Sequence, residues 1–142
     1  MDFDAFAVAW EAAWNSHDLD RILAHYSADV TFRSAKAMRL VGHGELRGKA
    51  ALRDYWARAL EAQPELSFVV VDVLHGHGML VITYSNHRDV LAAETLRMDA
   101  TGWRSRPLPA ICLRDVCRMG IHNPASMCES VRMVLILKKE PT

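Results

Sequence analysis

The chain has 142 residues, of which 51% are hydrophobic and 24% are charged, with a formal net charge of zero. This length and balance are typical of one globular domain with a buried core, and the zero net charge gives no sign of a broad nucleic-acid-binding surface. No apolar run is long enough to span a membrane, and the acidic opening Met1-Asp2-Phe3-Asp4 differs from a secretory signal peptide. We therefore expect a cytoplasmic protein without nucleic-acid or membrane partners.

The charges divide unevenly along the chain. Residues 1–102 carry 14 acidic and 10 basic side chains, whereas residues 103–142 carry 3 acidic and 7 basic ones and all three cysteines. An odd number of cysteines without a secretion signal argues against a disulfide framework. We predict a domain over residues 1–102 followed by a divergent segment over residues 103–142.

The N-terminal part of the sequence predicts two helices. Aromatic residues recur every three or four positions, at Phe3, Phe6, Trp10 and Trp14. This spacing predicts an amphipathic helix that Asp2 caps and that ends within residues 15–18. Asp18 is placed to cap a second, shorter helix, and a short strand over residues 30–33 follows.

The middle of the chain predicts a further helix and then a sheet. Residues 35–48 contain three glycines and are expected to form strands or loops, whereas residues 49–63 predict a third helix that ends before Pro64. The strand candidates that follow are residues 66–74, 79–86 and 90–98, with a turn over residues 75–78. Helices followed by consecutive strands are typical of an α+β fold with a mostly antiparallel sheet.

Glu94 stands out because it is acidic yet lies on the apolar face of the last predicted strand. Side chains alternate along a strand, so Glu94 shares its face with Val90, Ala92, Leu96 and Met98. A buried carboxyl group must be paired, hydrogen-bonded or kept neutral by a raised pKa, and such groups are frequent at functional sites. Two interpretations stay open: a structural carboxylate held by an indole N–H or an arginine, or a group that faces a pocket.

Four segments carry a recognisable set of motifs: Trp10–Asp20, Tyr26–Phe32, Gly48–Trp56 and Ala93–Asp99. Together they resemble the first helices, first strand, third helix and late core strand of the NTF2-like superfamily of SnoaL-like and ketosteroid-isomerase-like domains. The resemblance implies an NTF2-like cone, in which N-terminal helices pack in a curved, mostly antiparallel sheet. It also implies a ligand cavity at the open end, no cofactor, and a homodimer formed through the sheet.

The resemblance implies roles for single residues as well. Trp10 stands where ketosteroid isomerases place an oxyanion-hole tyrosine, and Glu94 stands where they place a protonated aspartate. Ser34 occupies the position of their general base, and because serine is no base at neutral pH, steroid isomerisation is not expected. We name Glu94 and Trp10 as candidate catalytic residues. The candidate substrate-binding residues are Trp14, Tyr26, Phe32, Ser34, Tyr55, Trp56 and Asn86.

More than one function is compatible with these residues. The first is a cofactor-independent isomerase, cyclase or hydrolase that acts by acid–base chemistry on a small apolar carbonyl, hydroxyl or epoxide compound. The second is a non-enzymatic ligand-binding or dimerisation module, in which the aromatic residues fill the core. The third is a family member without a working site. No metal site is expected: the cysteines and His122 are spaced more loosely than zinc ligands, and His75 and His77 stand in a glycine-rich turn.

The segment after residue 102 departs from the family pattern. Pro107 and Pro109 make a central strand over residues 103–109 unexpected. The apolar run over residues 131–138 is a candidate for the missing last strand. The alternative is a divergent tail, partly disordered.

Overall fold

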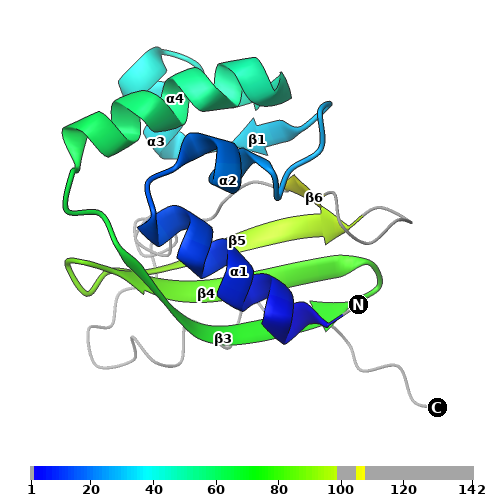
Figure 1. Cartoon of the computed structure of the whole chain (residues 1–142). Helices are drawn as coiled ribbons and strands as arrows, with labels where there is room; N and C mark the ends of the chain where they lie inside the picture. Colours follow the sequence, from blue (N-terminus) through cyan, green and yellow to red (C-terminus); the bar gives the residue numbers. More distant parts are fainter. Residues whose placement is uncertain (1, 99–104, 108–142) are drawn as a thin grey trace, which may run out of the picture.

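The computed structural model describes residues 2–98 and 105–107 of the chain (Figure 1). Its elements are α1 (Phe3–Asn15), α2 (Leu19–Leu23), β1 (Thr31–Arg33), α3 (Ala35–Val41), β2 (Glu45–Arg47), α4 (Gly48–Ala62), β3 (Phe68–Gly76), β4 (Met79–Asn86), β5 (Leu91–Met98) and β6 (Ser105–Pro107). Helices precede the long antiparallel strands, so the predicted α+β class is confirmed. The cysteines and the strand candidate over residues 131–138 lie outside the described residues. No helix in the described part is long and apolar enough to cross a membrane.

The strands form two antiparallel sheets of unequal size. The main sheet has the order β3-β4-β5-β6, and β1 and β2 form a separate pair. β6 lies beside β1, so the main sheet adjoins the small one. Figure 1 shows α1 lying across the main sheet, with α3 and α4 in a layer further from it. A β-bulge between Val70 and Asp72 interrupts the register of β3, a feature that bends a strand.

The first two helices begin where the sequence predicts. The Asp2 side chain accepts a hydrogen bond from the backbone N–H of Ala5. The Asp18 side chain accepts from the backbone N–H groups of Asp20 and Arg21. These caps satisfy N–H groups that the first turn of a helix leaves free, and each contributes about 1 kcal/mol to stability.

Helix α1 covers the outer edge of the main sheet. The Asn15 side chain donates to the backbone carbonyl of Phe68 at 2.9 Å and accepts from its N–H at 2.8 Å. Glu11 accepts from the backbone N–H of Val70 at 2.6 Å. Because β3 is an edge strand, these side chains occupy backbone groups that would otherwise be open to another strand.

Residues 35–41 form helix α3, so the expectation of strands or loops is wrong for this part of residues 35–48. Ser34 caps the helix, since its hydroxyl accepts from the backbone N–H of Lys36 at 3.1 Å. Gly42 ends it in the left-handed conformation, with φ of 80°. The residues between are mostly strong helix formers, and the three glycines of this segment all follow the helix instead of interrupting it.

The segment over residues 105–107 forms β6, where a central strand was not expected. It pairs with β5, with Leu96 opposite Pro107 and Met98 opposite Ser105. β6 lies at the end of the strand order, and an edge strand tolerates proline where a central strand does not. The sheet therefore continues past residue 102, the boundary predicted from composition.

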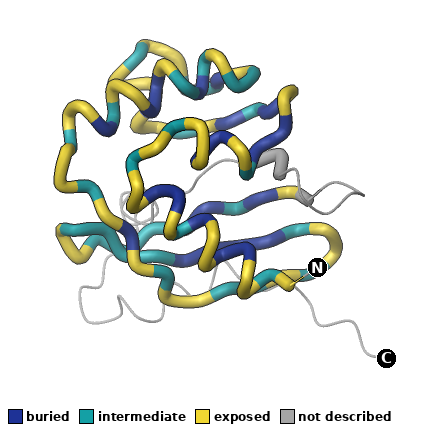
Figure 2. Tube along the Cα trace, viewed as in Figure 1, coloured by how far each residue is buried: buried dark blue, intermediate teal, exposed yellow. Residues whose placement is uncertain are grey.

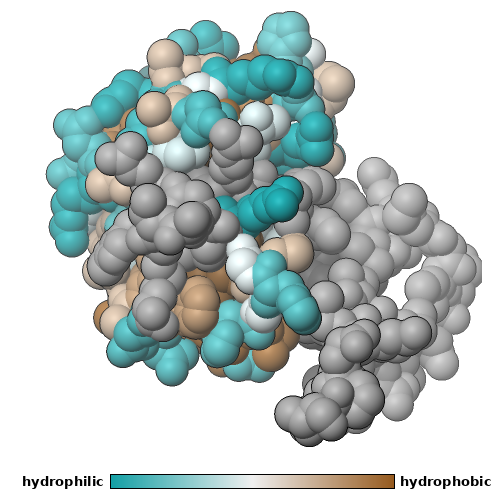
Figure 3. Space-filling model, turned by 90° about the vertical axis from the view of Figure 1, so that its right-hand side faces the viewer, coloured by the Kyte–Doolittle hydropathy of each residue, from teal (hydrophilic) through white to brown (hydrophobic). Residues whose placement is uncertain are grey.

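The core lies between the helices and the inner faces of β4 and β5 (Figure 2). The largest fully buried side chains are Trp10, Tyr26, Ile22, Leu52, Leu80, Ile82, Leu96 and Val30. On the side shown in Figure 3, hydrophilic residues dominate at the level of the helical layer, and hydrophobic ones gather lower, at the level of the main sheet.

Candidate functional site

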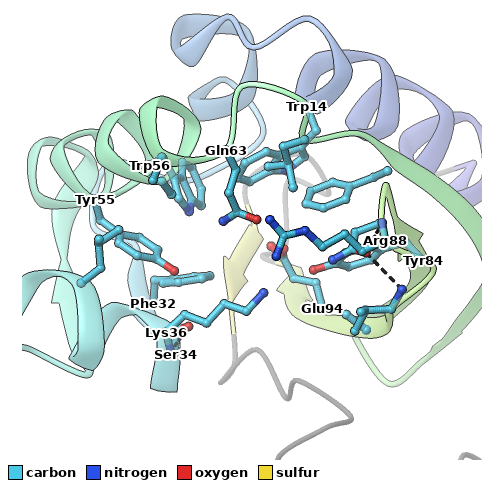
Figure 4. Close-up of a pocket in the computed structure, with 18 of the residues that line it drawn as sticks. Trp14, Phe32, Ser34, Lys36, Tyr55, Trp56, Gln63, Tyr84, Arg88 and Glu94 are labelled. Carbon is cyan, nitrogen blue, oxygen red and sulfur yellow. Dashed lines mark hydrogen bonds between the residues drawn. The ribbon is translucent and has the colours of Figure 1, made fainter.

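A cavity of about 740 Å³ lies between the helices and the main sheet (Figure 4). Its described lining comes from α1, β1, α3, α4 and the strands β3 to β5, which are far apart in the sequence. The volume falls in the range that holds small organic ligands. The cavity is therefore a product of the tertiary fold, and no single element defines it.

Six aromatic side chains wall this cavity: Trp14, Phe32, Tyr55, Trp56, Phe68 and Tyr84. They contact one another and also face the cavity. The ring centroids of Trp14 and Trp56 are 4.9 Å apart, and those of Phe68 and Tyr84 are 4.5 Å apart. Because these rings are packed, the wall is preformed and presents aromatic faces to a ligand.

Glu94 projects into the cavity from the middle of β5 (Figure 4). Only 3% of the residue is exposed, which agrees with the face assigned to it from the alternation of side chains. The hydroxyl of Tyr26 donates to its Oε1 at 2.6 Å. The described residues supply no other hydrogen bond to this carboxyl group.

Burial raises the pKa of Glu94 from its ordinary value of 4.5 to about 7, while the hydrogen bond from Tyr26 acts in the opposite direction. At neutral pH the protonated and ionised forms are therefore both populated. A group in this state can accept or donate a proton without a large energetic cost, as general acid–base catalysis requires.

Tyr26 and Trp10 form a hydrogen-bonded chain behind Glu94. The indole N–H of Trp10 donates to the Tyr26 hydroxyl at 3.1 Å, and both residues are 1% exposed. Burial, followed by the nearby charge of Glu94, raises the pKa of Tyr26 well above its usual value, so its hydroxyl stays a donor. Neither residue lines the cavity. The structure thus places the candidate donor Trp10 one layer behind the site, where it orients Tyr26.

Ser34 and Asn86 line the cavity, but their side chains also have structural roles. The Ser34 hydroxyl caps α3. The Asn86 side-chain oxygen accepts from the backbone N–H groups of Arg88 and Val90, at 2.9 and 3.1 Å, and so shapes the turn between β4 and β5. Both residues fix the backbone that carries other lining side chains.

Seven of the nine candidate site residues therefore meet at one cavity. They are Glu94, Trp14, Phe32, Ser34, Tyr55, Trp56 and Asn86. The other two, Trp10 and Tyr26, lie behind Glu94. The aromatic residues serve as core and as cavity wall at once, so the two interpretations of them do not exclude each other.

Sequence reasoning missed the polar lining residues Lys36, Arg39, Gln63 and Arg88. Lys36 and Arg39 lie on α3, a helix that was not predicted, and Arg88 lies in the turn after β4. The spacing of three residues between Lys36 and Arg39 would have placed both on one helical face if Ser34 had been taken as an N-cap.

The described residues contain no group of three or more His, Cys, Asp or Glu side chains that could hold a metal ion. The ring of His75 instead stacks on Phe3, with centroids 4.3 Å apart. His77 occupies the tight turn between β3 and β4 with φ of 50°. The cysteines and His122 lie outside the described residues.

Comparison with known proteins gives a family match and structural neighbours. Residues 7–107 match the model of the SnoaL-like domain. A SnoaL-like protein of unknown function from Burkholderia thailandensis E264 is 33% identical, with a TM-score of 0.67, over 76% of this chain and 90% of that chain. A comparison with curated protein sequences gives no match.

Two more distant structures share the fold. An NTF2-like protein of unknown function from Burkholderia pseudomallei K96243 is 13% identical, with a TM-score of 0.62, over 86% of this chain and 100% of that chain. A proposed SnoaL-like polyketide cyclase from Shewanella putrefaciens CN-32 is 17% identical, with a TM-score of 0.60, over 84% of this chain and 98% of that chain. At these identities the likeness concerns the fold alone.

Proposed function

The chain belongs to the SnoaL-like domain family, and from this premise we propose that it binds a small aromatic or polyketide-like compound and transfers protons within it, as a cyclase or isomerase does. One observation carries the proposal: Glu94 is buried at a cavity with aromatic walls, and its pKa is raised to about 7. A carboxyl group in that state can take a proton from a bound carbonyl compound and give it back.

The chemistry needs no co-reactant. The ionised Glu94 removes a proton from a carbon next to a carbonyl group, and the C–H electron pair moves into an enolate. In an isomerisation, protonated Glu94 returns the proton at another carbon. In a ring closure, the enolate carbon forms a bond to a second carbonyl carbon of the same molecule, and protonated Glu94 supplies the proton to the resulting alkoxide. Either route leaves Glu94 in its starting state.

The surroundings of Glu94 support this role. The aromatic walls surround Glu94 with groups less polar than water, which strengthens electrostatic interactions near it. Tyr26 holds one carboxyl oxygen at 2.6 Å, so the other keeps a fixed direction. Trp10 in turn fixes Tyr26. Such supporting hydrogen bonds restrict the geometry of the reacting group.

A second candidate function is a ligand-binding module without turnover. Ser34 favours it, since the residue at the family's general-base position is a serine that caps α3. Glu94 is moreover the only carboxylate among the described residues that line the cavity. A reaction that needs separate acid and base carboxylates is therefore not supported by the described lining.

The test compares wild type with Glu94→Gln, and Glu61→Gln serves as the control because Glu61 is exposed on α4 and away from the cavity. Ligands are first found by thermal shift with small ketones, phenols and epoxides, and turnover is then measured on those that bind. We expect Glu94→Gln to lose turnover and Glu61→Gln to keep it. Unchanged binding and turnover in Glu94→Gln would refute the proposal, and binding without turnover by wild type would favour the module.

A further inference from the structure

The mouth of the cavity carries an unbalanced positive charge. Lys36, Arg39 and Arg88 line the cavity, and Glu94 is the only acidic residue in the described lining. Glu94 is buried, whereas the three basic residues are exposed. The described residues that line the cavity therefore carry a net positive charge even when Glu94 is ionised.

The basic side chains come from two sides of the opening. Lys36 and Arg39 are three residues apart on α3 and so share one helical face. Arg88 lies in the turn between β4 and β5, where its backbone is held by Asn86. Figure 4 shows the side chains of Lys36 and Arg88 reaching toward the middle of the cavity from opposite sides.

Three arginines in the described part of the chain have carboxylate partners, and Lys36, Arg39 and Arg88 do not. Arg33 and Arg47 pair with Glu45, and Arg53 pairs with Asp20. In the described part of the chain, no carboxylate lies within ion-pair distance of Lys36, Arg39 or Arg88. Three like charges that line one cavity repel one another, and a bound anion would relieve that repulsion.

Arg39 also acts on the interior of the cavity. Burial raises the pKa of Tyr55, which lines the cavity, and hydrogen bonding with Ser34 lowers it. The charge of Glu94 raises this pKa, and the positive charge of Arg39 has a smaller, opposite effect. The charge of Arg39 is therefore felt at the aromatic wall, together with the opposing charge of Glu94.

From this arrangement we propose that the ligand is an aromatic acid: its rings lie against the aromatic walls, and its carboxylate or ionised enol is held at the mouth by Lys36, Arg39 and Arg88. The inference rests on the proposed function of the same cavity and adds the charge of the ligand. Arginine and lysine bind such anions by charge-assisted hydrogen bonds. An acid anchored at the mouth would present its far end to Glu94.

The test uses two probes with the same ring system, 2-naphthoate and its neutral methyl ester. Dissociation constants are measured by quenching of tryptophan fluorescence, since Trp14 and Trp56 line the cavity. We expect wild type to bind the acid about tenfold more tightly than the ester at low ionic strength. Raising sodium chloride from about 20 mM to about 500 mM should weaken binding of the acid and leave the ester unchanged.

Single substitutions test which basic residues cause the preference for the acid over the ester. Lys36→Gln and Arg88→Gln should each lose most of the preference for the acid, and Arg58→Gln, an exposed arginine of α4 outside the cavity lining, should keep it. All three replace exposed side chains, and thermal melting confirms that they fold. These measurements report binding alone, so failure of the acid–base proposal would show in the turnover of Glu94→Gln and not here. Equal binding of the two probes, binding of neither, or an unchanged preference in both cavity variants would overturn the inference.

Discussion

At the scale of single residues, the site depends on how Glu94 is solvated. The alternation of side chains along residues 90–98 was enough to place this carboxyl group on the buried face. The identity of its partner could not be predicted, because Tyr26 lies 68 positions away in the sequence and meets Glu94 only in the folded chain. Trp10 was predicted to be a donor, and it is one, but it donates to Tyr26.

The raised pKa of Glu94 predicts a pH-dependent stability. Unfolding returns the pKa from about 7 to its ordinary value of 4.5, so between these values the folded chain keeps a proton that the unfolded chain has lost. The stabilisation is complete below pH 4.5, is lost as pH rises toward 7, and amounts to roughly 3 kcal/mol over this window. Glu94→Gln lacks this titration.

Urea unfolding from pH 5 to pH 8 measures the effect. Wild type and Glu94→Gln should be close in stability at pH 5, and the variant should become the more stable protein as pH approaches 8. Other groups that titrate in both proteins cancel in the difference. A difference between the two proteins that stays constant over this range would show that Glu94 has an ordinary pKa in the fold.

At the scale of elements, α3 is the helix that the sequence analysis did not predict. The glycines over residues 42–48 suggested strands or loops, but they come only after α3 has ended at Val41: Gly42 caps that helix, and Gly48 is the first residue of α4. The missed signal was Ser34 followed by a run of helix formers and Gly42, which is a complete helix with its two caps. Missing α3 also meant missing Lys36 and Arg39, since their common direction exists only in a helix.

The capping role of Ser34 gives a prediction about stability that does not depend on any catalytic role of this residue. Ser34→Ala removes the hydrogen bond to the Lys36 N–H and should lower the free energy of unfolding by about 1 kcal/mol. Ser34→Asp keeps a capping oxygen and should preserve stability, which makes it the matched control. Urea unfolding measures both. Equal stability of Ser34→Ala and wild type would mean that the cap contributes little to α3.

At the scale of the whole molecule, the NTF2-like architecture predicted from the motifs is confirmed by the family match and the structural neighbours. Local patterns were sufficient for α1, α2, α4 and the hairpin strands, because their periodicity and caps lie within short windows. They were not sufficient for the cavity, whose lining joins residues from Trp14 to Glu94. The division at residue 102 and the role of residues 131–138 stay predictions.

The homodimer expected from the family resemblance also stays a prediction, and the main sheet carries exposed apolar residues that could take part in it. Val69 and Val71 of β3 are each 60% exposed, while Val70 between them packs against the core. The edge of β3 is partly occupied by Asn15 and Glu11 of α1, which disfavours edge-to-edge pairing at Phe68 and Val70. Association would therefore use the outer face of the sheet.

Sedimentation velocity at micromolar concentration tests this mode of association. We expect wild type to sediment as a dimer and Val71→Lys as a monomer, because a lysine at that position would place a charge in an apolar interface. Val8→Lys changes an equally apolar residue that is 70% exposed on α1, and it should leave the dimer intact. A monomeric wild type would contradict the expected homodimer. Dissociation by Val8→Lys but not by Val71→Lys would move the interface from the sheet to α1.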